Sequence, residues 1–266
     1  MCYNVKGLKE TQLKRAKRQG NDKAAKEIIE DLNDLFPGEH YHVSGFSHPS
    51  LVVYLDKTPF IPSLSIWGLI PSWVKSKEQK LKLWNNTLNA RGESIFDKPS
   101  FKNSAESKRC IIPVDGFYEY HWKNGKSFPY YISRQDGEPM NLAGLYENWV
   151  DVESGEEINS CSIVTTEGNK LMEGIHNSPK LDGPRMPVIL EPNQTENWLI
   201  TINTEQDKEQ INSLLKPVNN EVLIAHTVNK LKGKYTLQNS PSSADEFIYQ
   251  ELSDENSSDQ LSLFGN

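Results

Sequence analysis

The sequence predicts an α+β fold, with one β-rich domain over residues 1–237 and a disordered acidic tail over residues 238–266. Short apolar or alternating runs separated by Gly, Pro, Asn and Asp dominate residues 41–149, which is typical of strands. Segments with helical spacing of apolar residues lie on both sides of this region. Beyond Gln238 the composition turns to Ser, Asp, Glu and Asn, which does not support a packed core.

The expected elements follow in chain order. Residues 7–36 alternate charge along a helical face and end at Pro37-Gly38, which predicts one exposed helix or a helix pair. A short helix is expected around Gly168–Ile175 and a longer helical segment over residues 193–216. The expected strands are 51–56, 63–70, 109–120, 128–134, 141–150, 158–166, 186–190 and 222–228.

The bulk composition excludes several classes of protein. No stretch approaches the ~20 apolar residues that span a bilayer, and the N-terminus lacks the apolar core of a secretory signal. A cytoplasmic protein without a membrane partner is expected. The three cysteines form no CxxC pair, so no disulfide framework, metal site or other cofactor is predicted. Cys110 and Cys161 lie in apolar strand-like runs and are expected in the core.

The net charge of −7 argues at first against a nucleic-acid partner. However, six acids and no Lys or Arg follow from Asp245 onward, so the rest of the chain has 29 bases and 30 acids. Residues 73–110 contain nine bases and four acids, interrupted by Trp84, Phe96 and Phe101. This stretch fits a groove for a nucleic-acid strand, and equally well a solvated lysine-rich face.

Cys2 offers unusual chemistry once Met1 is removed, as is expected before a small second residue. The new terminus would carry a thiol and an α-amine on adjacent carbons. The amine, with a pKa near ~8, forms a Schiff base with an aldehyde, and the thiol then closes a five-membered thiazolidine. An internal cysteine cannot do this. Taken alone, an incidental cysteine at position 2 remains the simpler explanation.

Four further segments accompany Met1-Cys2. They are WGLIPSW at 67–73, NARGES at 89–94, GFYEY at 116–120, and Ile175-His176 followed by PRMPVIL at 184–190. In type, order and approximate spacing, these segments resemble the SRAP family, the SOS response-associated peptidases, over about residues 1–235. The resemblance implies the SRAP fold, with mixed, barrel-like sheets flanked by helices. It also implies a protein that shields abasic sites in single-stranded DNA by crosslinking to them.

The resemblance assigns four catalytic residues. Cys2 is the crosslinking nucleophile, Asn89 positions the terminus and the opened sugar, and Glu119 and His176 are the acid–base groups. A carboxylate or imidazole with a near-neutral pKa can give and retake the proton that Schiff-base formation requires. Glu119 lies between two tyrosines, and partial desolvation there is expected to raise its pKa. From the residues alone, an outward carboxylate and a surface or satisfied histidine remain the alternatives.

The resemblance also implies four DNA-binding residues: Trp73, Arg91, Thr165 and Arg185. The tryptophan would stack beside the lesion, the arginines would bind phosphate, and the threonine would lie near the sugar. Strand alternation in NARGES places Glu93 on the face of Asn89 and Arg91, so an Arg91–Glu93 ion pair is the alternative for that arginine. Trp67 is expected in the core.

The chain departs from the family pattern at three places. It reads Tyr3-Asn4 where members commonly have Gly-Arg, which removes a phosphate contact near the nucleophile. Val74 stands where a second aromatic often follows the stacking tryptophan. Residues 177–184, NSPKLDGP, intervene between the histidine and the arginine segment, which puts the position of Arg185 in question.

The end of the tail carries a further motif. Gln260, Leu261, Leu263 and Phe264 belong to a QLSLF segment that resembles the peptide by which bacterial replication and repair proteins bind the polymerase sliding clamp. An extended peptide at the end of a flexible tail can bury Leu263 and Phe264 in a partner's pocket. The alternative is a tail end with no partner. The protein itself is expected to be a monomer.

Three functions therefore remain open. The first is an abasic-site sensor that forms a DNA–protein crosslink through Cys2. The second is an N-terminal cysteine peptidase, and the third is a non-covalent reader of single-stranded DNA. A denaturing gel with an abasic oligonucleotide separates them.

Overall fold

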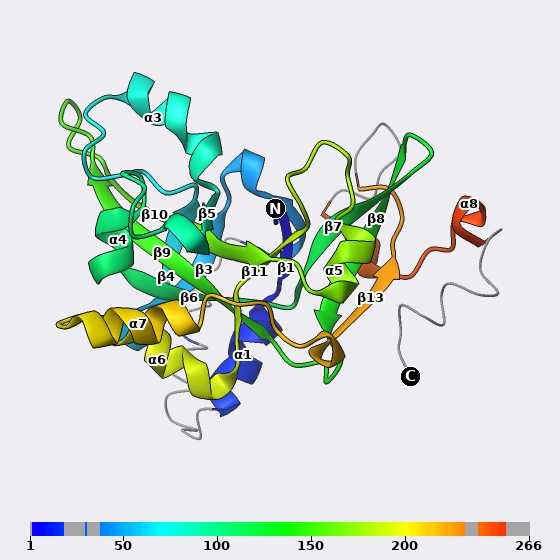
Figure 1. Cartoon of the computed structure of the whole chain (residues 1–266). Coiled ribbons are helices and arrows are strands. Elements are labelled where there is room, and N and C mark those ends of the chain that lie inside the picture. The colour runs from blue at the N-terminus through cyan, green and yellow to red at the C-terminus, as the bar shows by residue number, and fades with distance from the viewer. Residues whose placement is uncertain (1, 19–29, 31–37, 232–238, 254–266) are drawn as a thin grey trace.

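The computed structural model describes residues 2–18, 30, 38–231 and 239–253. Met1, most of the second half of the helical segment expected over 7–36, and residues 260–264, for which clamp binding is expected, lie outside the described residues. The fold is α+β and β-rich, as predicted. Figure 1 shows a larger group of strands flanked by α4, α6 and α7, with α3 standing above it, beside a smaller group that carries α5 and α8.

The larger sheet closes on itself. Its strands β10, β4, β3, β6 and β9 pair in that order, and β9 pairs again with β10 to complete the circuit. Their bounds are β3 Ser50–Leu55, β4 Thr58–Trp67, β6 Arg109–Val114, β9 Met140–Val150 and β10 Glu157–Glu167. Three short strands extend it: β5 Asn89–Arg91, β11 Arg185–Pro187 and β12 Ile189–Leu190. The barrel-like expectation is confirmed.

The smaller sheet places the N-terminus. Its order is β13 Leu223–Thr227, β8 Lys126–Arg134, β7 Gly116–Lys123, β1 Asn4–Gly7 and β2 His40–Ser44. Strand β1 runs antiparallel to both neighbours, with Asn4 opposite Ser44 on β2 and Tyr118 on β7. The residues just before β1 are therefore held beside β7, which contains the GFYEY motif.

A core fills the space between and within the sheets. Trp67, Cys110 and Cys161 are fully buried in one apolar cluster with residues of both sheets, as predicted. The indole N–H of Trp67 donates to the Leu88 carbonyl at 2.8 Å, which ties the end of β4 to the chain just before β5. This core fixes the strand ends that carry the WGLIPSW and NARGES motifs.

The helices flank the sheets. They are α1 Lys9–Arg18, α3 Lys77–Trp84, α4 Lys102–Ser107, α5 Lys170–Ile175, α6 Thr195–Leu199, α7 Glu205–Ser213 and α8 Gln250–Ser253. The helical segment expected over 193–216 is two helices, because Ile200 leaves the helical backbone and Thr204 caps α7 in a capping box with Asp207. No helix in the described part of the chain is long and apolar enough to cross a membrane.

The expected start of the disordered tail is wrong, because residues 239–253 pack on the domain. Asn239 donates to the carbonyl of residue 39 at 2.8 Å. Tyr249 is buried, its hydroxyl donates to the Val228 carbonyl at 2.9 Å, and its ring lies 5.1 Å from that of Phe128. The polar composition concealed the few aromatic residues that anchor this stretch.

Candidate active site

The N-terminal residues are held in a fixed place. Asn89 donates from its side-chain nitrogen to the Cys2 carbonyl at 2.8 Å, and the Gly45 amide donates to the Tyr3 carbonyl at 2.8 Å. The Cys2 side chain is fully buried, with its Sγ 3.8 Å from the Asn4 carbonyl oxygen. Burial, together with the nearby negative charge of a carboxylate, raises the pKa of the Cys2 thiol. The thiol is therefore protonated in this setting and needs a base before it can act as a nucleophile.

That nearby carboxylate is Glu119 on β7. It is buried, so it is not the outward carboxylate of an alternating strand. Burial raises its pKa from 4.5 to about 7. The raised pKa expected from its place between two tyrosines is confirmed. At neutral pH, this group exists in both the acid and the base form, which suits a residue that gives and retakes one proton.

His176 faces Glu119 from the end of α5. Its Nε2 lies 3.7 Å from Glu119 Oε2, and its Nδ1 accepts a hydrogen bond from the Arg185 amide at 3.0 Å. Burial, with nearby positive charges, lowers the pKa of His176 to about 4. A neutral ring whose Nδ1 accepts must carry its proton on Nε2, so an N–H points toward the carboxylate. His121 joins the two elements, with its Nδ1 2.8 Å from the Gly174 carbonyl oxygen of α5.

The NARGES segment adds an amide and a cation. Strand β5 pairs in parallel with β10, with Asn89 opposite Ile163 and Arg91 opposite Thr165. Asn89 is only 8 % exposed, and its Oδ1 has no hydrogen-bond donor among the described residues. Arg91 is exposed at the end of the strand. The side-chain oxygen of Asn89 is therefore free to accept a hydrogen bond from a bound molecule.

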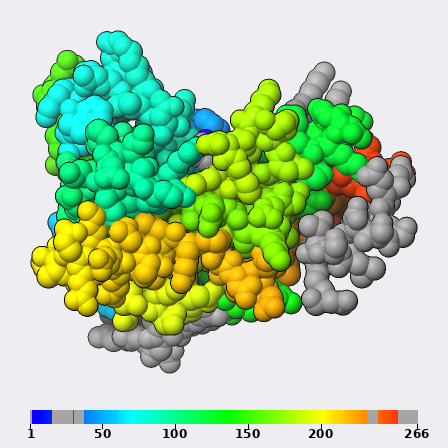
Figure 2. Space-filling view, viewed as in Figure 1, coloured from blue at the N-terminus to red at the C-terminus, as the bar shows by residue number. Residues whose placement is uncertain are grey.

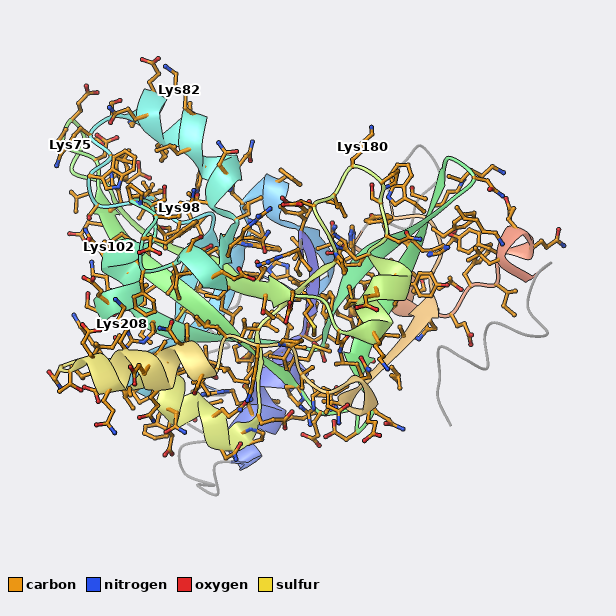
Figure 3. All side chains as sticks on the ribbon, viewed as in Figure 1. Lys75, Lys82, Lys98, Lys102, Lys180 and Lys208 are labelled. Carbon is orange, nitrogen blue, oxygen red and sulfur yellow. The ribbon has the colours of Figure 1, made fainter. Side chains whose placement is uncertain are left out.

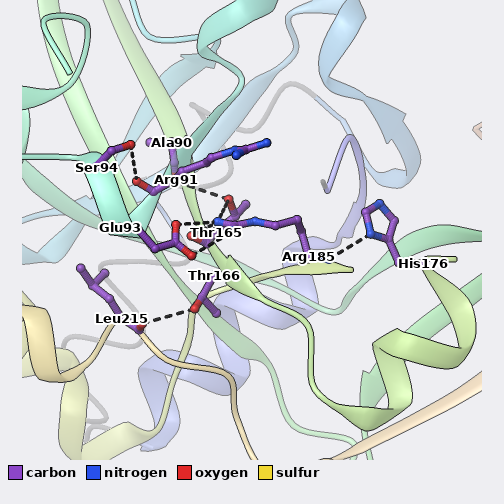
Figure 4. A network of polar contacts seen from close by, with 9 residues as sticks. All are labelled: Ala90, Arg91, Glu93, Ser94, Thr165, Thr166, His176, Arg185 and Leu215. Atoms are coloured by element: carbon purple, nitrogen blue, oxygen red, sulfur yellow. Dashed lines mark hydrogen bonds and ion pairs between the residues drawn. The ribbon is translucent and has the colours of Figure 1, made fainter. Parts of the chain in front are cut away.

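Arg185 is engaged by Glu93, as Figure 4 shows. Its two terminal nitrogens lie 2.7 and 2.9 Å from the two Glu93 carboxylate oxygens, and Nη2 also donates to the Thr165 carbonyl at 2.9 Å. The Arg91–Glu93 ion pair considered from the sequence is therefore not formed. The strand ends at Arg91, and Glu93 lies on the 3-10 helix η3 (Gly92–Ser94), so Glu93 does not continue the strand face as alternation predicted. Arg185 can reach a phosphate only by exchanging this carboxylate.

Trp73 and several lysines lie to one side of these groups. The indole N–H of Trp73 donates to the Pro99 carbonyl at 3.0 Å, while 42 % of the residue stays exposed. Figure 3 shows Lys75, Lys82, Lys98, Lys102 and Lys208 on this side of the molecule, and Lys180 on a loop across from them. Lys75, Lys98 and Lys102 are exposed and form no ion pair within the described part of the chain. Trp73 thus presents an aromatic surface next to unpaired cations.

The aromatic residues of the basic stretch do not line that surface. Phe96 and Phe101 are buried in a core cluster beneath α6 and α7, so the expectation that they border a groove is wrong. Trp84 stacks on His48 at 3.9 Å between ring centroids. Sequence composition could not separate these rings from Trp73, because all four belong to the same basic stretch over residues 73–110.

Two contributions to the site were missed from the sequence. Glu93 was noted only as a partner for Arg91, and its pairing with Arg185 depends on β11 lying beside β10. Tyr3, half-buried, packs its ring 4.9 Å from that of Phe46. The sequence indicates only that Tyr3-Asn4 replaces the Gly-Arg of the family pattern and removes a phosphate contact. No local pattern could have indicated either contact, since each joins segments far apart in the chain.

Comparison with known families decides the classification, because residues 8–235 match the model of the SOS response associated peptidase (SRAP) family. The chain belongs to the SRAP family. The SRAP match begins after Cys2, so the role of that residue is a separate question.

Individual SRAP-like relatives agree. The chain is 37% identical over 211 residues to "Abasic site processing protein YoqW" of Bacillus subtilis, which covers 77% of this chain and 88% of that protein. It is 30% identical over 172 residues to "Abasic site processing protein HMCES" of Xenopus tropicalis, covering 58% of this chain and 49% of that protein. A crystal structure of a Bacteroides thetaiotaomicron protein matches with a TM-score of 0.79 and 32% identity, covering 93% of this chain and all of that one.

Proposed function

We propose that this protein, once Met1 is removed, captures the aldehyde of an abasic site in single-stranded DNA through Cys2 and becomes covalently linked to it. The observation that carries the proposal is the cysteine at position 2, which Asn89 holds beside Glu119, a buried carboxyl group whose pKa is about 7. Relatives that are named abasic site processing proteins support the choice of substrate.

The reaction needs a group that first donates a proton to the departing hydroxyl group and later accepts one from the Cys2 thiol. The α-amine of Cys2 adds to C1′ of the ring-opened sugar to give a carbinolamine. Protonated Glu119 gives its proton to the hydroxyl group, which leaves as water while the C–N double bond forms. The Glu119 carboxylate then takes the proton of the Cys2 thiol, whose raised pKa makes this step necessary. The sulfur adds to C1′ and closes a thiazolidine ring, and Glu119 is protonated again.

His176 and Asn89 assist without forming bonds to the sugar. The Nε2–H of His176 faces Glu119 and stabilises the ionised carboxylate between the two proton transfers. The buried Oδ1 of Asn89 can accept a hydrogen bond from the α-amine or from a hydroxyl of the opened sugar. Both side chains are buried, which fixes their orientation before DNA arrives.

The DNA contacts follow from the surrounding groups. Trp73 presents its exposed ring to a base beside the lesion, since an abasic gap leaves a neighbouring base face uncovered. Arg91, exposed and close to the catalytic groups, binds a phosphate. Arg185 binds a second phosphate after releasing Glu93. Thr165 is buried beneath Arg185 and acts through it, rather than touching the sugar directly.

A denaturing gel tests the proposal. Protein that lacks Met1, verified by intact mass, is incubated with a single-stranded oligonucleotide containing one abasic site. A shifted band is expected for the native protein, and it should be absent with Cys2→Ala. Cys161→Ala is the matched control, because that cysteine is equally buried but is an internal residue without a free α-amine. No covalent band with native protein would refute the proposal.

The same gel separates the two other functions. A peptidase that uses Cys2 would release a peptide fragment without a persistent band containing DNA. A non-covalent reader would shift the oligonucleotide on a native gel but not on a denaturing one. The name of the family retains the word peptidase. The described site, however, offers a proton-exchanging carboxyl group beside the terminus, which the crosslinking reaction uses directly.

We also propose that Gln260, Leu261, Leu263 and Phe264 bind a bacterial sliding clamp. The support is their sequence pattern at the end of an acidic segment, which suits an extended docking peptide. A pull-down with purified clamp is expected to retain the full chain and to lose a chain truncated after residue 259. Equal retention of both would contradict the proposal.

A further inference from the structure

Residues 177–184 form a closed loop on the edge of the candidate site. His176 precedes the loop and Arg185 follows it, and the Arg185 amide is only 3.0 Å from His176 Nδ1. The chain therefore leaves and returns at one point, as in Ω-type loops. Both ends of the loop are site residues, so whatever the loop touches lies next to the reacting groups.

The base of the loop is anchored. The side chain of Asn177 accepts from the Trp122 amide at 2.7 Å and donates to the Trp122 carbonyl at 3.1 Å, which joins the loop to β7, the strand that carries Glu119. At the other end, the Gly168 amide donates to the Pro184 carbonyl at 2.9 Å. The left-handed φ of +87° at Gly183 turns the chain back toward this anchor.

The tip of the loop is exposed and amphipathic. Residues 179–183 are all exposed, and Leu181 has 37 % of its surface accessible. Lys180 forms no ion pair within the described residues. Asp182 lies two positions beyond Lys180, so the tip carries no net charge and would act by local contact rather than by long-range attraction.

The tip faces the other wall across a hollow. Figure 3 shows Lys180 on one side and Lys75, Lys82 and Lys98 on the other. In the space-filling view of Figure 2, a notch separates the lobe of α3 from the projecting chain after α5, and blue atoms of the early part of the chain lie at its base. Trp73 lies on the side of Lys98, because its indole N–H donates to the Pro99 carbonyl and only three residues separate it from α3. The notch is therefore walled by an exposed tryptophan segment and by this loop.

We propose that loop 177–184 is the second wall of the strand-binding groove, with Leu181 packing on the base that flanks the abasic site on the side away from Trp73, and Lys180 contacting the backbone phosphate there. An abasic gap leaves two base faces without a stacking neighbour, and a single tryptophan covers only one of them. An apolar side chain on the opposite wall covers the second. The inference rests on the proposed function only for the identity of the strand.

Substrates that have a base on only one side of the abasic position test the Leu181 contact. The probe is single-stranded DNA with a tetrahydrofuran abasic analogue, which has no aldehyde, so binding is measured by anisotropy whether or not crosslinking occurs. The analogue is placed internally, at the 5′ end or at the 3′ end. Leu181→Ser is expected to weaken internal-site binding by about fivefold, at the low end of one base contact. The loss should vanish on one end-substrate and persist on the other, and Trp73→Ala should show the reverse preference.

A salt series tests the Lys180 contact. Lys180→Gln is expected to reduce the slope of log affinity against log salt by about 0.7, the value for one phosphate contact with a single strand. Ile61→Ser and Lys57→Gln are matched controls, because both are exposed near the β3–β4 turn, at the far end of β3 from the N-terminal contacts. They should leave both measurements unchanged.

The outcomes separate this inference from the proposed function. Equal loss on all three substrates with Leu181→Ser, or no loss on any, would overturn the wall assignment, as would an unchanged salt slope for Lys180→Gln. Failure of the native protein to crosslink a true abasic site would refute the proposed chemistry instead, and would leave the analogue-binding result valid.

Discussion

The pKa of Glu119 makes a quantitative prediction about stability. Its folded pKa of about 7 lies above the ordinary value of 4.5, so between these pH values the folded state holds a proton that the unfolded state has lost. The stability contributed by this proton is fully present below pH 4.5 and is lost as pH rises to 7. At about 1.4 kcal/mol per pKa unit, the loss is about 3 kcal/mol.

In the native protein, the pH dependence of stability that comes from Glu119 should be masked, because His176 contributes a pH dependence of opposite sign. Its folded pKa of about 4 lies below the ordinary 6.5, so the unfolded state binds more protons between these values and stability rises with pH over that window. The two contributions overlap and largely cancel. Replacing Glu119 by Gln removes one of them, and the pH dependence of the other then becomes visible.

The assay is urea unfolding followed by tryptophan fluorescence at intervals from pH 4 to pH 8. The free energy of unfolding of the native protein minus that of Glu119→Gln is expected to fall by about 3 kcal/mol between pH 4.5 and pH 7. Titrating groups that do not face Glu119 are common to both proteins and cancel in the difference. A difference that stays constant across this range would show that Glu119 titrates normally, and would remove it as the proton donor at neutral pH.

Three further predictions follow from individual contacts. Asn89→Ala should slow crosslinking at least tenfold, because it removes the 2.8 Å hydrogen bond to the residue-2 carbonyl; single-turnover gels measure this. Glu93→Gln should free Arg185 for phosphate and steepen the salt dependence of single-strand binding by about 0.7 in slope, whereas an unchanged slope would show that the exchange does not occur. Tyr249→Phe should lower the unfolding free energy by about 1 kcal/mol in urea titrations, and no change would show that the stretch 239–253 is not packed as described.

Local patterns predicted much of the fold. The alternating runs correspond to strands. Trp67, Cys110 and Cys161 are core residues, because apolar residues in such runs are usually buried. The composition of residues 239–253 does not reveal their packing, because Tyr249 is buried against Phe128 of β8, while Phe247 is 40 % exposed and lies against the Tyr249 ring. The composition of a segment gives its average polarity and does not indicate which part of the domain it packs against.

The sequence predicted the residues of the candidate site that belong to recognisable motifs, but it did not predict the contacts between them. The positions of Cys2, Asn89, Glu119 and His176 came from motif order, and the structure places these residues close together. The pairing of Glu93 was not foreseen, because strand alternation stops at a three-residue strand. A tertiary pairing between segments 92 residues apart leaves no local signal in a single sequence.

The most direct test of the account is the chemical nature of the bond at residue 2. Native protein without Met1 is crosslinked to an abasic oligonucleotide, digested, and the N-terminal peptide is weighed, with and without borohydride. We expect an adduct on Cys2 that has lost one water and is stable without reductant, and in Cys2→Ser an imine that is recovered only after borohydride reduces it to a secondary amine. An adduct on a lysine, or an equally stable unreduced adduct in Cys2→Ser, would contradict it.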